Sequence, residues 1–84
     1  MEKKRIGTIF TYFAKVGVAG IKLEEEVKLG EKISIEGATT KIEQILDSMQ
    51  IDRNSVQVAK AGQELGIKVS DRVRPGDIVY RITD

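Results

Sequence analysis

Side chains that commonly perform acid–base, nucleophilic or metal chemistry near neutral pH are scarce in this sequence. The 84 residues include no cysteine and no histidine, so the thiolate nucleophile, the commonest metal ligand and the usual general base are missing. Glu24, Glu25, Glu26 and Asp84 show no spacing that would enclose a hard cation. We expect no catalytic residue, no metal site and no cofactor, and therefore a domain that works by binding a partner.

A glycine-rich stretch, Gly17-Val18-Ala19-Gly20, is the nearest approach to a phosphate-binding loop. Such a loop needs a lysine and a hydroxyl residue after its second glycine to hold the phosphates and magnesium. Neither follows Gly20, so we interpret the stretch as a structural turn and expect no nucleotide binding.

Basic residues cluster loosely at both ends of the chain, although fourteen basic and thirteen acidic residues leave a net charge of only +1. If the chain ends lie close together, these groups form one positive patch that contacts RNA phosphates. The alternative is an ordinary solvated surface, because Asp71 and Asp77 accompany the second group and aromatic residues are few. The candidate contact residues are Lys3, Lys4, Arg5, Arg53, Lys68, Arg72 and Arg74.

The elements that would position these residues show the two-residue periodicity of β-strands. In the first strand, Ile6, Thr8, Phe10 and Tyr12 fall on one face, and Ile9 and Phe13 on the other. We expect Phe10, Tyr12 and Phe13 to lie in the core. Further strands are expected over 18–23, around Ile33 and Ile35, over 65–69 and over 78–82.

Residues 40–51 have an ambiguous pattern, because Ile42, Ile45, Leu46 and Met49 also fit helical spacing. No helix cap or stop signal brackets the segment, and the β-branched pair Thr39-Thr40 leads into it. We therefore predict one long, bent strand, with a bulge near Ile45-Leu46.

Glycine followed by an acidic or amide residue recurs at Gly30-Glu31, Gly62-Gln63 and Gly76-Asp77. In Arg74-Pro75-Gly76-Asp77, proline presets the first turn angle and glycine accepts a positive φ. We interpret the recurrence as repeated turn chemistry. Six short strands separated by such turns predict a single all-β domain over 1–84, closed into a barrel.

Five sequence blocks are spread over nearly the whole chain: Ile6-Gly7-Thr8-Ile9, Lys28-Leu29-Gly30-Glu31-Lys32-Ile33, Ser48-Met49-Gln50-Ile51, Ala61-Gly62-Gln63-Glu64-Leu65-Gly66 and Pro75-Gly76-Asp77-Ile78-Val79. Together they resemble the second domain of translational GTPases such as elongation factor Tu. This resemblance implies a six-stranded Greek-key barrel of the reductase/isomerase/elongation-factor type. Similar barrels are found in the initiation factor that handles initiator tRNA and at the C-terminus of some collagenase-like peptidases.

The resemblance also implies a groove, lined by Gln50 and Glu64, where such factors hold the aminoacyl end of tRNA. Gln50 stands where a glutamate is typical and Glu64 where an asparagine is typical, so aminoacyl recognition is not expected. Our leading hypothesis is a non-catalytic cytoplasmic module that contacts RNA, the ribosome or a translation-related protein, without membrane contact. The alternative is a protein-interaction subunit of a separately encoded enzyme such as a collagenase-like peptidase.

Overall fold

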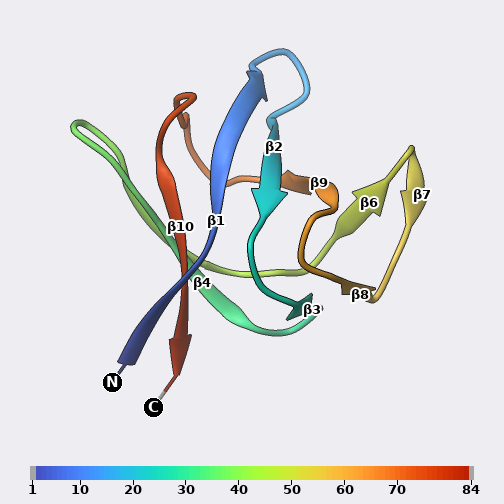
Figure 1. Ribbon diagram of the computed structural model, residues 1–84. Helices are drawn as coiled ribbons and strands as arrows, with labels where there is room; N and C mark the ends of the chain where they lie inside the picture. Colours follow the sequence, from blue (N-terminus) through green and yellow to red (C-terminus); the bar gives the residue numbers. More distant parts are fainter. Residues whose placement is uncertain (1, 84) are drawn as a thin grey trace.

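The computed structural model describes residues 2–83, which form ten β-strands (Figure 1). In chain order these are β1 (Glu2–Phe13), β2 (Val18–Leu23), β3 (Val27–Lys28), β4 (Lys32–Glu36), β5 (Lys41–Ile45), β6 (Met49–Ile51), β7 (Asn54–Ser55), β8 (Val58–Ala59), β9 (Glu64–Lys68) and β10 (Ile78–Thr83). The prediction of an all-β protein is confirmed. Residues 40–51 contain strand and no helix, as expected.

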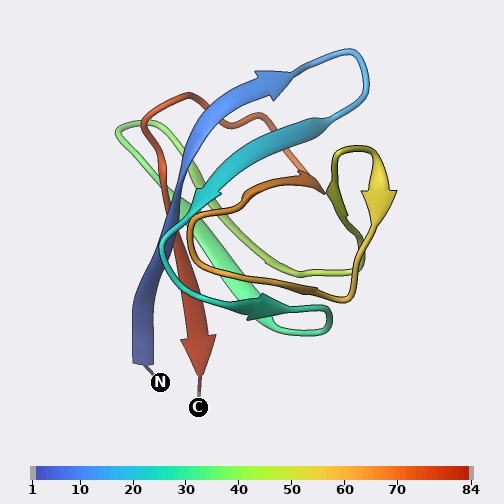
Figure 2. The ribbon, with the colours of Figure 1, turned by 45° about the vertical axis from the view of Figure 1, so that its right-hand side comes forward.

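Eight strands form one curled antiparallel sheet in the order β5-β4-β10-β1-β2-β9-β6-β7, and β3 pairs with β8 separately. The buried apolar residues form one core cluster inside the curl. β1 and β10 lie side by side and bring the two chain ends together, as Figures 1 and 2 show. Glu2 pairs with Thr83, so the two ends of the described segment lie next to each other.

The predicted six-stranded closed barrel is wrong in strand number and in closure, because residues 2–83 form an open eight-stranded sheet. The expected long strand over 40–51 is divided: β5 pairs with β4, and β6 pairs with β9. Ile45, the last residue of β5, is 52% exposed, whereas Leu46, which follows it, is buried. The adjacent apolar residues thus mark a break between two strands, where we had predicted a bulge within one.

The side chain of Gln44 spans the seam between β5 and the end of β9. Its amide nitrogen donates to the carbonyl of Lys68 at 2.8 Å, and its amide oxygen accepts from the backbone N–H of Ser70 at 2.9 Å. One side-chain amide thereby provides the donor and acceptor that a neighbouring strand would provide. Gln44 holds the curled sheet together where no backbone ladder forms among the described residues.

Two irregularities in β1 change which side chains face the core. Two residues of β1 oppose one of β10 between Arg5 and Gly7, and the pairing with β2 skips Phe10 between Ile9 and Thr11. An extra residue reverses the alternation beyond it. Ile9 is consequently buried and Tyr12 packs against the core, whereas Phe10 and Phe13 face outward.

The predicted turn chemistry is confirmed at all three glycine positions, where φ is +91° at Gly30, +88° at Gly62 and +97° at Gly76. Each residue after the glycine donates its N–H to the carbonyl three residues earlier, at 3.1–3.3 Å. Its side-chain oxygen then accepts the N–H of that earlier residue, at 2.7–2.9 Å. Glu31, Gln63 and Asp77 therefore close their turns in the same way.

We predict that Gln44→Ala lowers the free energy of unfolding by about 1–3 kcal/mol, because two hydrogen bonds worth roughly 0.5–1.5 kcal/mol each are lost. Urea denaturation measures this change. The control is Gln57→Ala, since Gln57 is exposed and its side chain makes no hydrogen bond within residues 2–83. Equal stability of the two variants would show that the Gln44 bridge does not hold the seam.

Candidate functional site

A groove lies on the outer face of the sheet, between the β1–β2 hairpin and the β6–β7 hairpin. Figure 2 shows the β6–β7 hairpin, in yellow, beneath the end of the β1–β2 hairpin, in blue and cyan. The groove has a volume of about 400 Å³. It is lined by Phe10, Thr11, Phe13, Val18, Gly20, Gln50, Asp52, Arg53, Glu64, Leu65 and Gly66.

Two glycines form the floor of this groove. Gly20 of β2 and Gly66 of β9 are directly opposite each other in the ladder, and Gly66 also pairs with Gln50 of β6. A glycine within a strand leaves backbone bare, so another group can approach closely. At Gly20 the space is occupied by the wall of the groove, because a Cβ there would lie 2.8 Å from Cζ of Phe10.

The wall of the groove is aromatic and exposed. Phe10 is 46% and Phe13 56% accessible to solvent, so the prediction that both lie in the core is wrong. The irregularity of β1 between Arg5 and Gly7 turns Phe10 outward, and the one at Phe10 turns Phe13 outward and Tyr12 inward. Val16, 59% exposed in the adjoining turn, extends the apolar surface. Adjacent exposed apolar side chains of this size are typical of interaction surfaces.

The rim of the groove is polar and includes both predicted groove residues, Gln50 and Glu64. Asp52 and Arg53 form the tip of the β6–β7 hairpin with φ of 51° and 66°. Non-glycine residues adopt this left-handed region at a cost of about 1 kcal/mol each, and such strain often accompanies functional sites. The structure therefore brings Gln50, Arg53 and Glu64 together around one hollow.

The first group of predicted contact residues lies elsewhere and is paired with carboxylates. Lys4 contacts Glu25 at 3.1 Å and Arg5 contacts Glu24 at 3.1 Å. Lys3 donates a hydrogen bond to Glu36, which raises the pKa of Lys3. The same bond, with a second one from Ser34, lowers the pKa of Glu36. These cations are engaged within their own domain, by the β2–β3 connection and by β4.

The second group of predicted contact residues does not merge with the first. Arg72 and Arg74 line a hollow with Thr11, six residues along β1 from Arg5, roughly 20 Å at the rise of an extended strand. Lys68 lies at the end of β9, beside the seam. The described residues therefore do not form the expected single basic patch. Lys3, Lys4 and Arg5 lie at one end of β1, whereas Arg72 and Arg74 lie beside Thr11, toward its other end.

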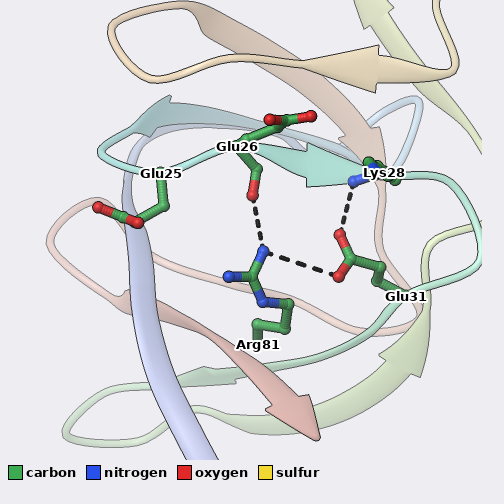
Figure 3. Close-up of a pocket in the computed structure, with 5 residues that line it drawn as sticks. All are labelled: Glu25, Glu26, Lys28, Glu31 and Arg81. Carbon is green, nitrogen blue, oxygen red and sulfur yellow. Dashed lines mark hydrogen bonds and ion pairs between the residues drawn. The ribbon is translucent and has the colours of Figure 1, made fainter.

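A further hollow surrounds Arg81, whose guanidinium points between the backbone of Glu26 and the carboxylate of Glu31 (Figure 3). Its Nη1 donates to the carbonyl of Glu26 at 2.7 Å and lies 3.6 Å from Oε2 of Glu31. The other oxygen of Glu31 accepts the N–H of Lys28 at 2.7 Å. Arg81 thus ties β10 to the β3 region, and we interpret this hollow as structural.

Within residues 2–83, no three metal-binding side chains lie close enough to hold an ion. Asp84, named with the glutamate run above, lies outside the described residues. Residues 2–83 contain no helix that is long enough and apolar enough to span a membrane.

Sequence reasoning identified the polar rim of the groove but missed its floor, its wall and the Gln44 bridge. The signal for the floor was present, since Gly20 and Gly66 each interrupt an apolar strand pattern. The sequence alone does not predict that Gly20 lies opposite Gly66, because this register is set by the pairing of β2 with β9, which are far apart in the chain.

Comparison with known proteins gives peptidase relatives. The chain is 40% identical over 84 residues to an uncharacterized protease of Methanocaldococcus jannaschii and 35% identical over 82 residues to a collagenase of Porphyromonas gingivalis. The two matches include 99% and 95% of this chain. They span only 21% and 23% of the length of the relatives. No protein-family model matches.

The solved structures that resemble this fold include the C-terminal domain of a Geobacillus thermoleovorans protein assigned as a U32 peptidase. The TM-score is 0.89 at 16% identity, over 95% of this chain and 93% of that one. The selenomethionine form of the same domain gives a TM-score of 0.86, over 90% and 96% of the two chains. At this identity the likeness shows the fold alone.

These findings correct the resemblance to the second domain of translational GTPases. The sequence relatives are a protease and collagenases, and the structural relative is a peptidase domain. The description of the chain as translation-elongation-factor-like is therefore wrong. The five sequence blocks fall largely on turns and strand starts that the small β-domain itself requires, so they indicated a fold and not a translation factor.

We predict that Gly20→Ala destabilises the fold by about 1–3 kcal/mol, because the new Cβ would lie 2.6 Å from Thr11 Cγ2 and 2.8 Å from Phe10 Cζ. Gly66→Ala is the matched control across the ladder, where the nearest atoms are 3.7 Å away. Its stability should change by less than about 1 kcal/mol. Thermal and urea unfolding compare them, and equal losses would contradict the described packing of Phe10 over Gly20.

Proposed function

We propose that this domain is a non-catalytic protein-interaction module of a collagenase-like peptidase, and that it contacts the peptidase's catalytic part through the groove. The observation that carries the proposal is the match of almost the whole chain to about one fifth of a protease and of collagenases. The remaining four fifths of those relatives leave ample chain for a catalytic part.

The groove has the physical properties of a polypeptide-binding surface. Phe10 and Phe13 supply exposed aromatic area at its wall, and aromatic side chains contribute most at protein interfaces when a partner covers them. The backbone at Gly66, where the nearest atoms to an added Cβ are 3.7 Å away, leaves room for a partner's side chain between the two hairpins. Gln50 and Glu64 offer hydrogen-bonding groups that fix the orientation of a docked chain.

The composition favours a binding role over a catalytic one. Without cysteine or histidine, the domain has none of the usual nucleophile–base pairs of a peptidase. Several of its charged residues pair with one another, as at Lys4–Glu25, Arg5–Glu24 and Arg81–Glu31. We propose that it acts in the cytoplasm and leaves peptide hydrolysis to its partner.

The test is affinity capture from native lysate with the tagged domain, with and without nuclease, followed by mass spectrometry. We expect a polypeptide similar to the catalytic part of the M. jannaschii protease, captured equally after nuclease treatment. The double variant Phe10→Ser/Phe13→Ser should reduce capture at least about tenfold, because central aromatic residues at interfaces contribute about 2 kcal/mol or more.

The matched control is Val58→Ser, which removes an apolar side chain that is 41% exposed on β8, outside the groove. Capture by this variant should equal that by the unmodified domain. Capture that depends on RNA, or that survives loss of both phenylalanines, would refute the assignment of the groove.

A further inference from the structure

A second hollow lies along the end of β1, next to the groove. It has a volume of about 580 Å³ and is lined by Thr11, Tyr12, Arg72, Val73, Arg74 and Pro75. Thr11 lines both hollows. A bound polypeptide that extends from the aromatic groove across β1 would therefore reach this second hollow. The two hollows therefore form neighbouring parts of one surface.

The segment that carries the two arginines is fixed from beneath. Val73 is buried in the core, 1% exposed, and the exposed Arg72 and Arg74 flank it on either side. The N–H of Arg74 donates to the carboxylate of Asp77 at 2.9 Å, and the N–H of Asp77 donates back to the Arg74 carbonyl at 3.1 Å. A fixed backbone lowers the entropy lost when such side chains bind a partner.

The positive charge of this hollow has no partner in the described part of the chain. Neither guanidinium of Arg72 or Arg74 makes an ion pair or hydrogen bond there. Asp71 and Asp77 accept backbone N–H groups of these arginines instead. This differs from Lys3, Lys4 and Arg5, which all have carboxylate partners.

We propose that the hollow binds the carboxylates of an acidic segment of a protein partner, with Arg72 and Arg74 as the contacting groups. Paired guanidinium groups suit carboxylates because each can donate two parallel hydrogen bonds. A protein segment is favoured over an RNA strand because the sequence relatives of the chain are a protease and collagenases. The inference rests on the proposed function, since it names the chemistry of the protein segment that the same surface recognises.

The experiment titrates the ¹⁵N-labelled domain with the peptide acetyl-Glu-Glu-Phe-Glu-Glu-amide, its Lys counterpart and a single-stranded RNA of four phosphates. We expect only the acidic peptide to bind strongly, with shifts at the amides of Thr11, Tyr12, Val73 and Arg74. Arg72→Gln/Arg74→Gln should weaken that binding about tenfold or more, and added salt should weaken it further.

The control variant is Lys41→Gln/Lys60→Gln, which removes the same charge from side chains outside both hollows. It should bind the acidic peptide within about twofold of the unmodified domain. Three results would each overturn the proposal: no binding of the acidic peptide, binding that is unchanged without the two arginines, or tighter binding of RNA. If the acidic peptide does not bind but the domain still captures the peptidase through Phe10 and Phe13, only this inference is wrong and the proposed function stands.

Discussion

The extra residue at Phe10, set against Gly20 of the neighbouring strand, is the feature on which the binding surface depends. It reverses the alternation of β1 beyond Phe10, so that Tyr12 packs on the core while Thr11 and Phe13 face outward beside Phe10. Gly20 permits this arrangement, because any larger residue would overlap the Phe10 ring and Thr11. A regular strand would have turned Phe13 inward, leaving the groove without half of its wall.

The curl of the sheet places the second hairpin opposite this wall. β6 pairs with β9 while β5 pairs with β4, so residues 46–48 carry the chain across the seam. Gln44 joins the two sides of the seam through its hydrogen bonds to Lys68 and Ser70. Three glycine turns, each closed by the side chain of the residue after the glycine, redirect the chain at Gly30, Gly62 and Gly76. The strained Asp52-Arg53 tip then rises beside Gly66 to complete the groove.

Local features of the fold could be predicted from the sequence, whereas features set by strand pairing could not. The glycine turns followed from residue type, because only their own side chains and backbone close them. Ile42 and Met49 were correctly placed in strand, and both are buried. The outward turn of Phe13 was missed because it depends on a register shift against β2, and the Gln44 bridge because its partners lie 24 and 26 residues away. Gln50 and Glu64 were found as a pair only through a resemblance whose functional content was wrong.

The central claim is that the outward-facing end of β1 is the surface that meets a peptidase. A photo-crosslinking amino acid at position 13 tests it most directly, with position 58 as the reference, since Phe13 and Val58 are both exposed and only Phe13 lines the groove. On irradiation in native lysate, the account predicts that position 13 becomes attached to a peptidase polypeptide and that position 58 does not. Attachment of position 13 to RNA, or equal attachment at both positions, would contradict it.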